Sequence, residues 1–297
     1  MSIAMTRDTK PPPTAVRLQP ASGPRSWRRP RIGVHAAIAA MLFLSIIPVY
    51  LMVVVSFKNP LQYLHERWTV SFPLRILNYM AAWEQIGSYI LNTFFVALVG
   101  FAGMVVLSTV SAYVFARMRF PFREHIYYAI IALLLVPWML SFVPAYMVYT
   151  QFGLVDTYWA LIVPRIVNGS IFGIFLLRAF FAGLPEEIFE AARIDGAGSF
   201  ALIWHITIPM STGILATLAV LDFIGAWNDF LWPFVAISSK SKRVISVGLY
   251  LLQADTAGAG LGPLFSGYTI ASIPLAILFF ALGKYYVEGL VESGLKA

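Results

Sequence analysis

Only 12% of the 297 residues in this chain are charged, so few side chains could do chemistry. Three charged side chains lie inside long apolar runs, namely Arg165, Asp222 and Asp229. A charge within an apolar span is costly, and it usually faces a cavity or pairs with an opposite charge. Asp222 and Asp229 are seven residues apart, so on one helix they would share a face about 10 Å apart. Two interpretations follow: an ion pair between Arg165 and Asp229, or a polar lining that contacts a solute.

Other kinds of chemistry find no support in the sequence. No phosphate-binding loop occurs, and the one Gly-Lys pair, Gly283-Lys284, is followed by tyrosine, so we expect no ATP hydrolysis by this chain. The absence of cysteine excludes disulfides and thiolate metal sites. The four histidines are scattered, without a second ligand at metal-binding spacing, and no Gly-x-Ser-x-Gly motif is present. We therefore expect a chain that is not an enzyme and binds neither metal nor cofactor.

The elements that position these charges are membrane spans. Hydrophobic residues make up 59% of the chain and form long runs, and about 20 apolar residues in a helix cross the hydrocarbon core. We expect an all-α polytopic membrane protein. Its six predicted spans are residues 36–57, 88–116, 126–149, 158–178, 211–236 and 267–287. Prolines inside several spans predict kinks, and Gly169 with Gly173 predicts close approach of two helices.

The charges outside the spans predict the orientation. Residues 1–31 hold seven Lys and Arg residues against one acid and are rich in proline, so we interpret them as a disordered tail that precedes a permease domain at 32–297. Because basic segments remain on the cytoplasmic side, both termini should be cytoplasmic, with residues 58–87 and 238–266 outside. Most of the net charge of +7 lies in this tail, beside the first span, so we expect membrane headgroups and not nucleic acid as its partner.

A cytoplasmic loop at residues 183–209 predicts a helix-turn-helix. Pro185 suits the first helical position, two glutamates follow it in the first turn, and Gly196 suits the end of the helix. Ser199 could cap a second short helix that ends before Pro209. Small and apolar residues would bury one face, namely Ile188, Ala191, Ala192 and Ile194.

The spacing within this loop resembles the permease subunits of binding-protein-dependent ABC importers. Their cytoplasmic signature is Glu-Ala-Ala, three residues, Gly, nine residues, and Ile-x-Leu-Pro. Here Glu190-Ala191-Ala192, Gly196, Ile206 and Pro209 stand at those positions, with Ile208 replacing leucine. Further segments are similar to the shorter permease of maltose-type carbohydrate importers, namely residues 154–164, 175–178, 193–197 and 227–233.

The resemblance implies a fold and a set of partners. The fold is the six-span architecture of type I ABC importer permeases in the bacterial inner membrane. The partners are a second permease, two copies of an ATPase subunit that uses ATP and Mg, an extracytoplasmic binding protein and a carbohydrate. The resemblance assigns contact with the ATPase to Glu190, Ala191, Ala192, Asp195 and Gly196.

The resemblance also implies that the central spans line the solute pathway. Candidate pathway residues are Arg165, Asn168, Asp222, Trp227, Asn228 and Asp229. At the position of Arg165 the family more often has an apolar or aromatic residue, so the arginine favours an acidic sugar. Alternatives are an importer for a non-sugar solute, such as a polyol phosphate, and a self-contained carrier or channel.

Overall fold

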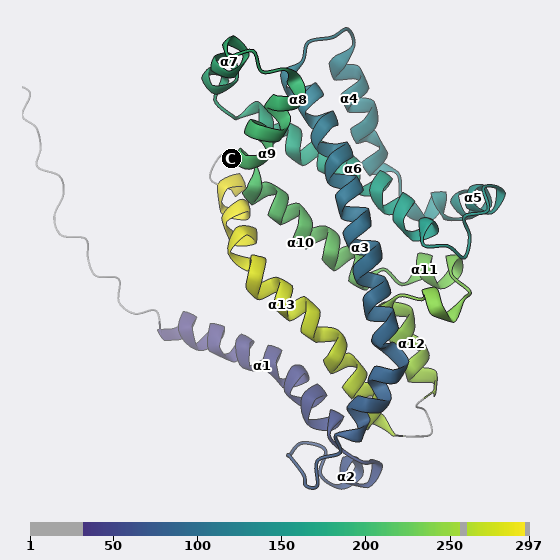
Figure 1. The fold of residues 1–297 in the computed structure, drawn as a ribbon. Helices are drawn as coiled ribbons and strands as arrows, with labels where there is room; N and C mark the ends of the chain where they lie inside the picture. Colours follow the sequence, from purple (N-terminus) through teal and green to yellow (C-terminus); the bar gives the residue numbers. More distant parts are fainter. Residues whose placement is uncertain (1–31, 256–259, 295–297) are drawn as a thin grey trace, which may run out of the picture. The chain divides into compact units, whose positions relative to one another are not determined.

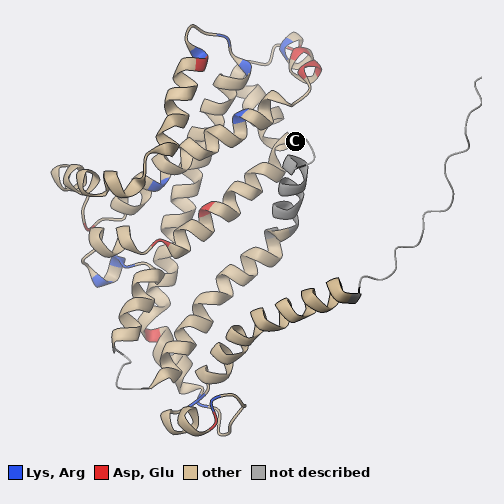
Figure 2. Cartoon of the chain, turned by 180° about the vertical axis from the view of Figure 1, so that it is seen from behind, with Lys and Arg blue, Asp and Glu red and all other residues tan. Residues whose placement is uncertain are grey.

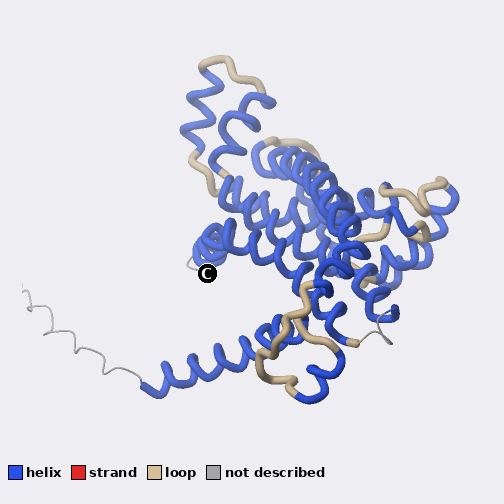
Figure 3. Tube along the Cα trace, turned by 60° about the horizontal axis from the view of Figure 1, so that its bottom comes forward, coloured by secondary structure: helices blue, strands red, loops and turns tan. Residues whose placement is uncertain are grey.

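A computed structural model describes residues 32–255 and 260–294, and these divide into two units between Ile46 and Ile47. The predicted tail at residues 1–31 lies outside the described residues. Within the described ranges the chain consists of helices and loops, without a strand (Figure 3). The all-α prediction is therefore confirmed.

Four helical segments are long and apolar enough to cross a membrane individually. They are residues 33–56 of α1 (Ile32–Ser56), α3 (Leu77–Arg117), α6 (Trp159–Ala182) and residues 261–281 of α13 (Leu261–Gly294). The number reaches six if two bent helix pairs each count as one span. Since α3 begins at residue 77 and not at 88, its first turns occupy part of the segment that we expected outside the membrane. A short helix, α2 (Pro60–His65), precedes it.

The first bent pair occupies the predicted span at 126–149, one of the spans in which proline predicted a kink. It joins α4 (Arg123–Ala132) and the turn Leu133–Leu135 to α5 (Trp138–Gln151) at an angle of 98°. Proline lacks the N–H that a helix needs and disfavours helical geometry in the residue before it. Accordingly, Val136 has an extended ψ of 116° immediately before Pro137. The predicted kink is therefore confirmed at Pro137, and its angle divides the span into two helices.

The second bent pair changes the predicted span at 211–236. A segment formed by α8 (Ser199–Leu202), a π-turn (Ile203–Thr207) and α9 (Ile208–Met210) meets α10 (Thr212–Asn228) at 78°. The predicted end before Pro209 is wrong, because α9 begins before this proline and continues past it. The N-cap of α8 is Gly198, without a side-chain cap from Ser199. After α10 the chain breaks at Asp229 and forms α11 (Leu231–Ala236).

The long helix α3 packs along α6 and also contacts α10, α12 (Ile245–Asp255) and α13. Glycines allow the close approach of α3 and α6. A Cβ on Gly103 of α3 would lie 2.5 Å from Cδ1 of Ile166, and one on Gly173 of α6 would lie 2.8 Å from Cβ of Ser108. These distances are too short for real side chains, so the predicted role of Gly169 and Gly173 in close helix packing is confirmed.

The helix α3 links regions of the fold that lie far apart. It contributes Val96, Ile86, Tyr113 and Phe115, one to each of the four hydrophobic clusters of the described chain. Figure 1 shows α2 near one end of α3, and α7 (Glu186–Ile194) beyond the other end. Charged residues gather around α7 and the loop between α3 and α4, and are sparse along the helix middles (Figure 2).

Candidate functional site

A cavity of about 720 Å³ contains five of the six predicted pathway residues. The helix α6 contributes Arg165 and Asn168, and α10 contributes Asp222 and Asn228. Asp229 lines the cavity from the break after α10. The remaining walls come from α5, α11 and the bend before α5. The bend before α5 and the break after α10 therefore form part of this cavity.

An ion pair occupies the cavity, but its acid is Asp222. Nη2 of Arg165 lies 3.4 Å from Oδ1 of Asp222 and donates a hydrogen bond of 2.6 Å to the backbone oxygen of the same residue. The predicted pair of Arg165 with Asp229 is wrong. Its physical reason is that α10 ends at Asn228, so Asp229 has an extended ψ of 111° and does not continue the helix face of Asp222.

The ion pair leaves hydrogen-bonding capacity unused. Only 13% of the Arg165 side chain and 9% of the Asp222 side chain are exposed. Nε of Arg165 and Oδ2 of Asp222 have no hydrogen-bond partner among the described residues. A buried polar atom without a partner is unfavourable, because it loses its bonds to water. The ion pair that lines the cavity therefore keeps one buried donor and one buried acceptor without a partner in the described chain.

Two tryptophans differ from what the sequence indicated. Trp227 does not line the cavity: its side chain is buried beside α13, and its Nε1 donates to the backbone oxygen of Ala271 at 3.1 Å. Trp232 was missed as a candidate and does line the cavity, with Nε1 bonded to the oxygen of Ala160 at 2.7 Å. The second tryptophan enters the cavity because α11 folds back after the break at Asp229.

The helix α7 has the ends that the loop sequence predicted, shifted by one residue at the start. Pro185 is the N-cap, so the first helical residue is Glu186. At the other end Gly196 has a φ of +87°, a conformation that favours glycine. Its N–H donates to the backbone oxygen of Arg193 at 3.0 Å, and the N–H of Ala197 donates to the backbone oxygen of Ala192 at 2.9 Å. These two bonds form a Schellman cap, which ends a helix sharply.

The two faces of α7 differ in exposure. Phe189 is fully buried in the cluster formed with α3 and α6, and Ala192 packs partly against it. Glu190, Ala191, Asp195 and Gly196 are exposed. Ile188 and Ile194 are also exposed, by 40% and 86%, so the predicted burial of these two residues and of Ala191 within this chain is wrong. Ile194 is the more exposed of the two isoleucines.

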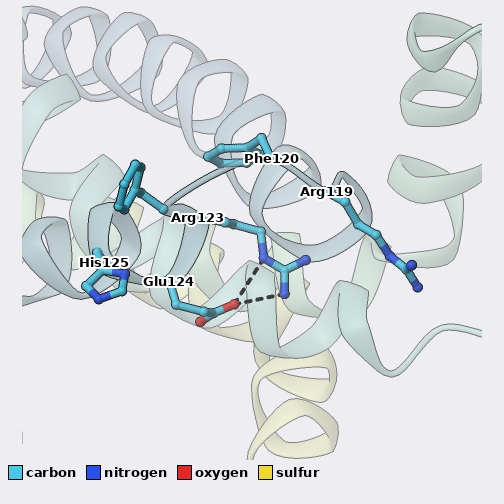
Figure 4. A pocket seen from close by; sticks show the side chains of 6 residues that line it. Arg119, Phe120, Arg123, Glu124 and His125 are labelled. Carbon is cyan, nitrogen blue, oxygen red and sulfur yellow. Dashed lines mark hydrogen bonds and ion pairs between the residues drawn. The ribbon is translucent and has the colours of Figure 1, made fainter.

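A second, open cavity of about 400 Å³ lies at the loop between α3 and α4 (Figure 4). Its charged residues are Arg119, Arg123, Glu124 and His125, and Figure 4 shows Arg123 bonded to Glu124. Both Glu124 oxygens also accept hydrogen bonds of 2.7 Å from Arg178 of α6. The charge of Glu124 is thus balanced by two arginines of this chain. None of the predicted site residues lines this second cavity.

Bent apolar spans, a polar cavity within them and an exposed capped helix between two spans define a membrane component of a transport system. Comparison with known families agrees: residues 104–291 match the family described as "Binding-protein-dependent transport system inner membrane component". The chain belongs to this family. Its members are transporter components, so the chain is a permease, and the six-span interpretation with two bent spans applies to it.

Individual relatives cover most of the chain. It is 31% identical to a probable ABC transporter permease protein, YurM, of Bacillus subtilis, over 92% of this chain and 91% of the relative. It is 30% identical to the diacetylchitobiose uptake system permease protein NgcG of Streptomyces coelicolor, over 88% and 87%. A permease-fold chain from the crystal structure of a bacterial ABC transporter involved in the import of the acidic polysaccharide alginate superposes with a TM-score of 0.76. It is 21% identical and covers 89% of this chain and 100% of that chain.

Proposed function

We propose that the chain forms one half of the membrane pathway of an ATP-driven carbohydrate importer. The names of relatives support the substrate class, since they include NgcG and an arabinooligosaccharide transport permease, AraQ, that is 27% identical. The partners in this proposal are a second permease, two ATPase subunits that use ATP and Mg, and an extracytoplasmic binding protein. Both termini are cytoplasmic. The chain itself binds no cofactor.

A non-sugar solute is the alternative with a specific observation in its favour. The sn-glycerol-3-phosphate transport permease UgpE of Yersinia pestis is 32% identical over 70% of this chain and 73% of the relative. A self-contained carrier has less support, because the family is one of components that act with a binding protein. A transport assay with both solute classes separates the first two possibilities.

The exposed face of α7 is the observation that supports ATPase docking. Glu190, Ala191, Asp195 and Gly196 face outward, and Ala192 lies half-buried beneath them. Small residues permit close approach of a partner, and the exposed Ile194 offers apolar surface for the contact. The opposite face is anchored by Phe189, so the helix is presented as a rigid unit. In this proposal, movement of the ATPase subunits displaces α7 and rocks the spans.

Substitutions in α7 test the docking proposal. Glu190→Lys reverses an exposed charge, and Gly196→Pro removes the N–H that forms part of the cap. Both variants should insert normally yet lose solute uptake and binding-protein-stimulated ATP hydrolysis in proteoliposomes. The control is Glu84→Lys, which changes an exposed acid at the far end of α3 and should leave both activities intact. Unchanged uptake in both α7 variants would contradict the docking proposal.

The cavity at Arg165 contributes to the solute pathway in this proposal, and its charges favour a neutral sugar. Two carboxylates, Asp222 and Asp229, stand against one guanidinium, which already pairs with Asp222. Hydroxyl groups both donate and accept, so they suit a lining that combines carboxylate, amide and guanidinium groups. An anionic sugar would meet excess negative charge. The acidic sugar that Arg165 favoured in isolation is therefore the less suitable ligand.

Competition between substrates tests this assignment. Uptake of a neutral oligosaccharide should continue in the presence of excess acidic oligosaccharide and stop with excess neutral competitor. Asn168→Ala and Asn228→Ala should raise KM for the neutral solute, because both amides line the cavity. Gln85→Ala supplies a control, because this amide is exposed on α3 and lies outside the cavity. Stronger inhibition by the acidic competitor would show that the charge argument is wrong.

A further inference from the structure

We propose that Arg117, the last residue of α3, is the positioning residue that transmits movement of α7 to the membrane spans. The inference rests on the proposed docking of the ATPase on α7. It concerns how the docked helix moves the rest of the chain, which neither the family nor the docking signature specifies.

The contacts of Arg117 tie three parts of the docking segment to α3. Nη2 donates to the backbone oxygens of Phe181 and Leu184, each at 2.6 Å, at the end of α6 and in the turn before α7. Nη1 pairs with the carboxylate of Glu186, the first residue of α7. The guanidinium carbon lies 4.3 Å from the ring centroid of Phe189, inside α7. One side chain therefore holds the entry, the first turn and the buried face of α7.

Burial makes this connection stiff. Only 7% of the Arg117 side chain is exposed. Hydrogen bonds to a charged donor are stronger than neutral ones, and the planar guanidinium allows little freedom when two of its nitrogens are bonded. A displacement of α7 that left α3 in place would break several of these contacts together. Movement of α3 together with α7 preserves these contacts and therefore costs less free energy.

Because α3 is long, such a movement would affect distant parts of the fold. The helix runs from Leu77 to Arg117 and contributes to all four hydrophobic clusters of the described chain. Along this length it packs on α6, α10, α12 and α13. A shift imposed at Arg117 would therefore reach both the walls of the Arg165 cavity and the far end of the fold.

Arg178 offers a matched control. It also pairs with a carboxylate, Glu124, through two bonds of 2.7 Å, and its guanidinium carbon lies 3.8 Å from the ring of Tyr127. Its contacts join α6 to α4 and do not involve α7. Substitution of Arg178 removes an ion pair and an aromatic contact of the same kind, but between α6 and α4. A general effect of losing such an arginine would therefore appear in both variants.

The test compares Arg117→Met and Arg178→Met in the full complex with its ATPase, reconstituted in proteoliposomes. We measure copurification of the ATPase, ATP hydrolysis, and solute imported per ATP hydrolysed. Arg117→Met should keep the ATPase bound and hydrolysing while the imported solute per ATP falls about tenfold, a size typical of coupling between sites. Arg178→Met should leave that ratio unchanged. An unchanged ratio in Arg117→Met, or an equal fall in Arg178→Met, would overturn the proposal.

A spectroscopic readout separates transmission from stability. The chain contains no cysteine, so a spin label can be placed by Glu84→Cys near the far end of α3. Its spectrum should change on addition of ATP in the otherwise unaltered chain and lose that change with Arg117→Met. Arg117→Lys and Glu186→Gln keep part of the contacts and should give intermediate responses, which also serve if Arg117→Met fails to assemble. A full ATP response in all three variants contradicts the proposal, whereas absence of an ATPase from the unaltered complex contradicts the docking on which it rests.

Discussion

Two buried arginines of this permease stand in contrasting surroundings. Arg117 uses both terminal nitrogens, for two backbone oxygens and a carboxylate, and packs on an aromatic ring. Arg165 uses Nη2 alone, in a looser pair with Asp222 whose second oxygen has no partner in the described chain. Nε of each is buried without a partner, so the difference lies at the ends of the two guanidinium groups and in the acids.

The contrast indicates two uses of one residue type. A guanidinium held by fixed backbone acceptors on neighbouring segments acts as a mechanical joint, because both of its terminal nitrogens are bonded within the chain. A guanidinium in a looser ion pair that lines a cavity of about 720 Å³ lies where a ligand can approach the pair. We therefore associate Arg117 with coupling and Arg165 with the solute.

Breaking the Arg165 pair should produce the largest change in stability. Arg165→Leu leaves Asp222 buried and uncompensated, and removing one partner of a buried pair costs about 3–5 kcal/mol. Arg165→Leu with Asp222→Leu should recover most of that loss yet still fail to transport. Thermal unfolding and uptake of the purified complex measure both effects.

The control for this prediction is the double variant Arg165→Leu with Asp229→Leu. It leaves Asp222 without its cation, so it should remain as unstable as the single variant. Recovery of stability with Asp229→Leu and not with Asp222→Leu would show that the pairing in the cavity is assigned to the wrong acid.

The seam between α3 and α6 connects the two arginines, and crowding it should have an intermediate effect. A Cβ at Gly103 would lie 2.5 Å from Cδ1 of Ile166, so Gly103→Leu must push the helices apart. Overpacking of this kind typically costs about 1–3 kcal/mol. Gly213→Leu is the control, because a Cβ there meets nothing within 4 Å. Equal thermal stability of the two variants would contradict tight packing along this seam.

The smallest effect on stability is expected at a surface carboxylate, that of Asp156. The carboxylate of Asp156 accepts bonds from the backbone N–H groups of Ser238 and Ser239, and its pKa is lowered to about 2, first of all by the Ser239 hydroxyl. Since the folded pKa is lowered, the stabilisation is complete above about pH 4 and lost as the pH falls toward 2.

Comparison with Asp156→Asn measures this contribution. The difference in Tm between the unaltered permease and the variant should stay constant from pH 8 to pH 5 and shrink below about pH 4. The effect should be small, because exposed ion groups contribute little. A difference that changes between pH 8 and pH 5 would indicate another titrating group.

Local chemistry made part of this structure predictable. The start of α7 follows from a proline with acids after it, and its end from Gly196, because both signals act within a few residues. Long apolar runs likewise predicted α1 and α6 closely. Hydropathy reports only the mean over a window, so it missed the break at Asp229 inside the predicted span at 211–236, and it gave no angle for the kink at Pro137.

The candidate site was less predictable because it depends on distant pairings. Asp222 and Asp229 seemed equivalent by spacing, and only the end of α10 at Asn228 separates them. The sequence did not predict a role for Arg117, a basic residue at a helix end, because its acceptors lie 64 to 69 residues further along the chain. Trp227 has the composition of a sugar contact, yet packing against α13 directs it into the core.

Docking of an ATPase on α7 is the central claim, and site-specific cross-linking in this cysteine-free chain tests it most directly. Single cysteines introduced by Glu190→Cys and Lys242→Cys, in the assembled complex, are treated with a short bifunctional thiol reagent and analysed for adducts with the ATPase subunit. The account predicts an adduct at position 190 and none at position 242, with position 242 labelled by an impermeant thiol reagent in intact cells. An ATPase adduct at position 242, or labelling of position 190 from outside the cell, would contradict it.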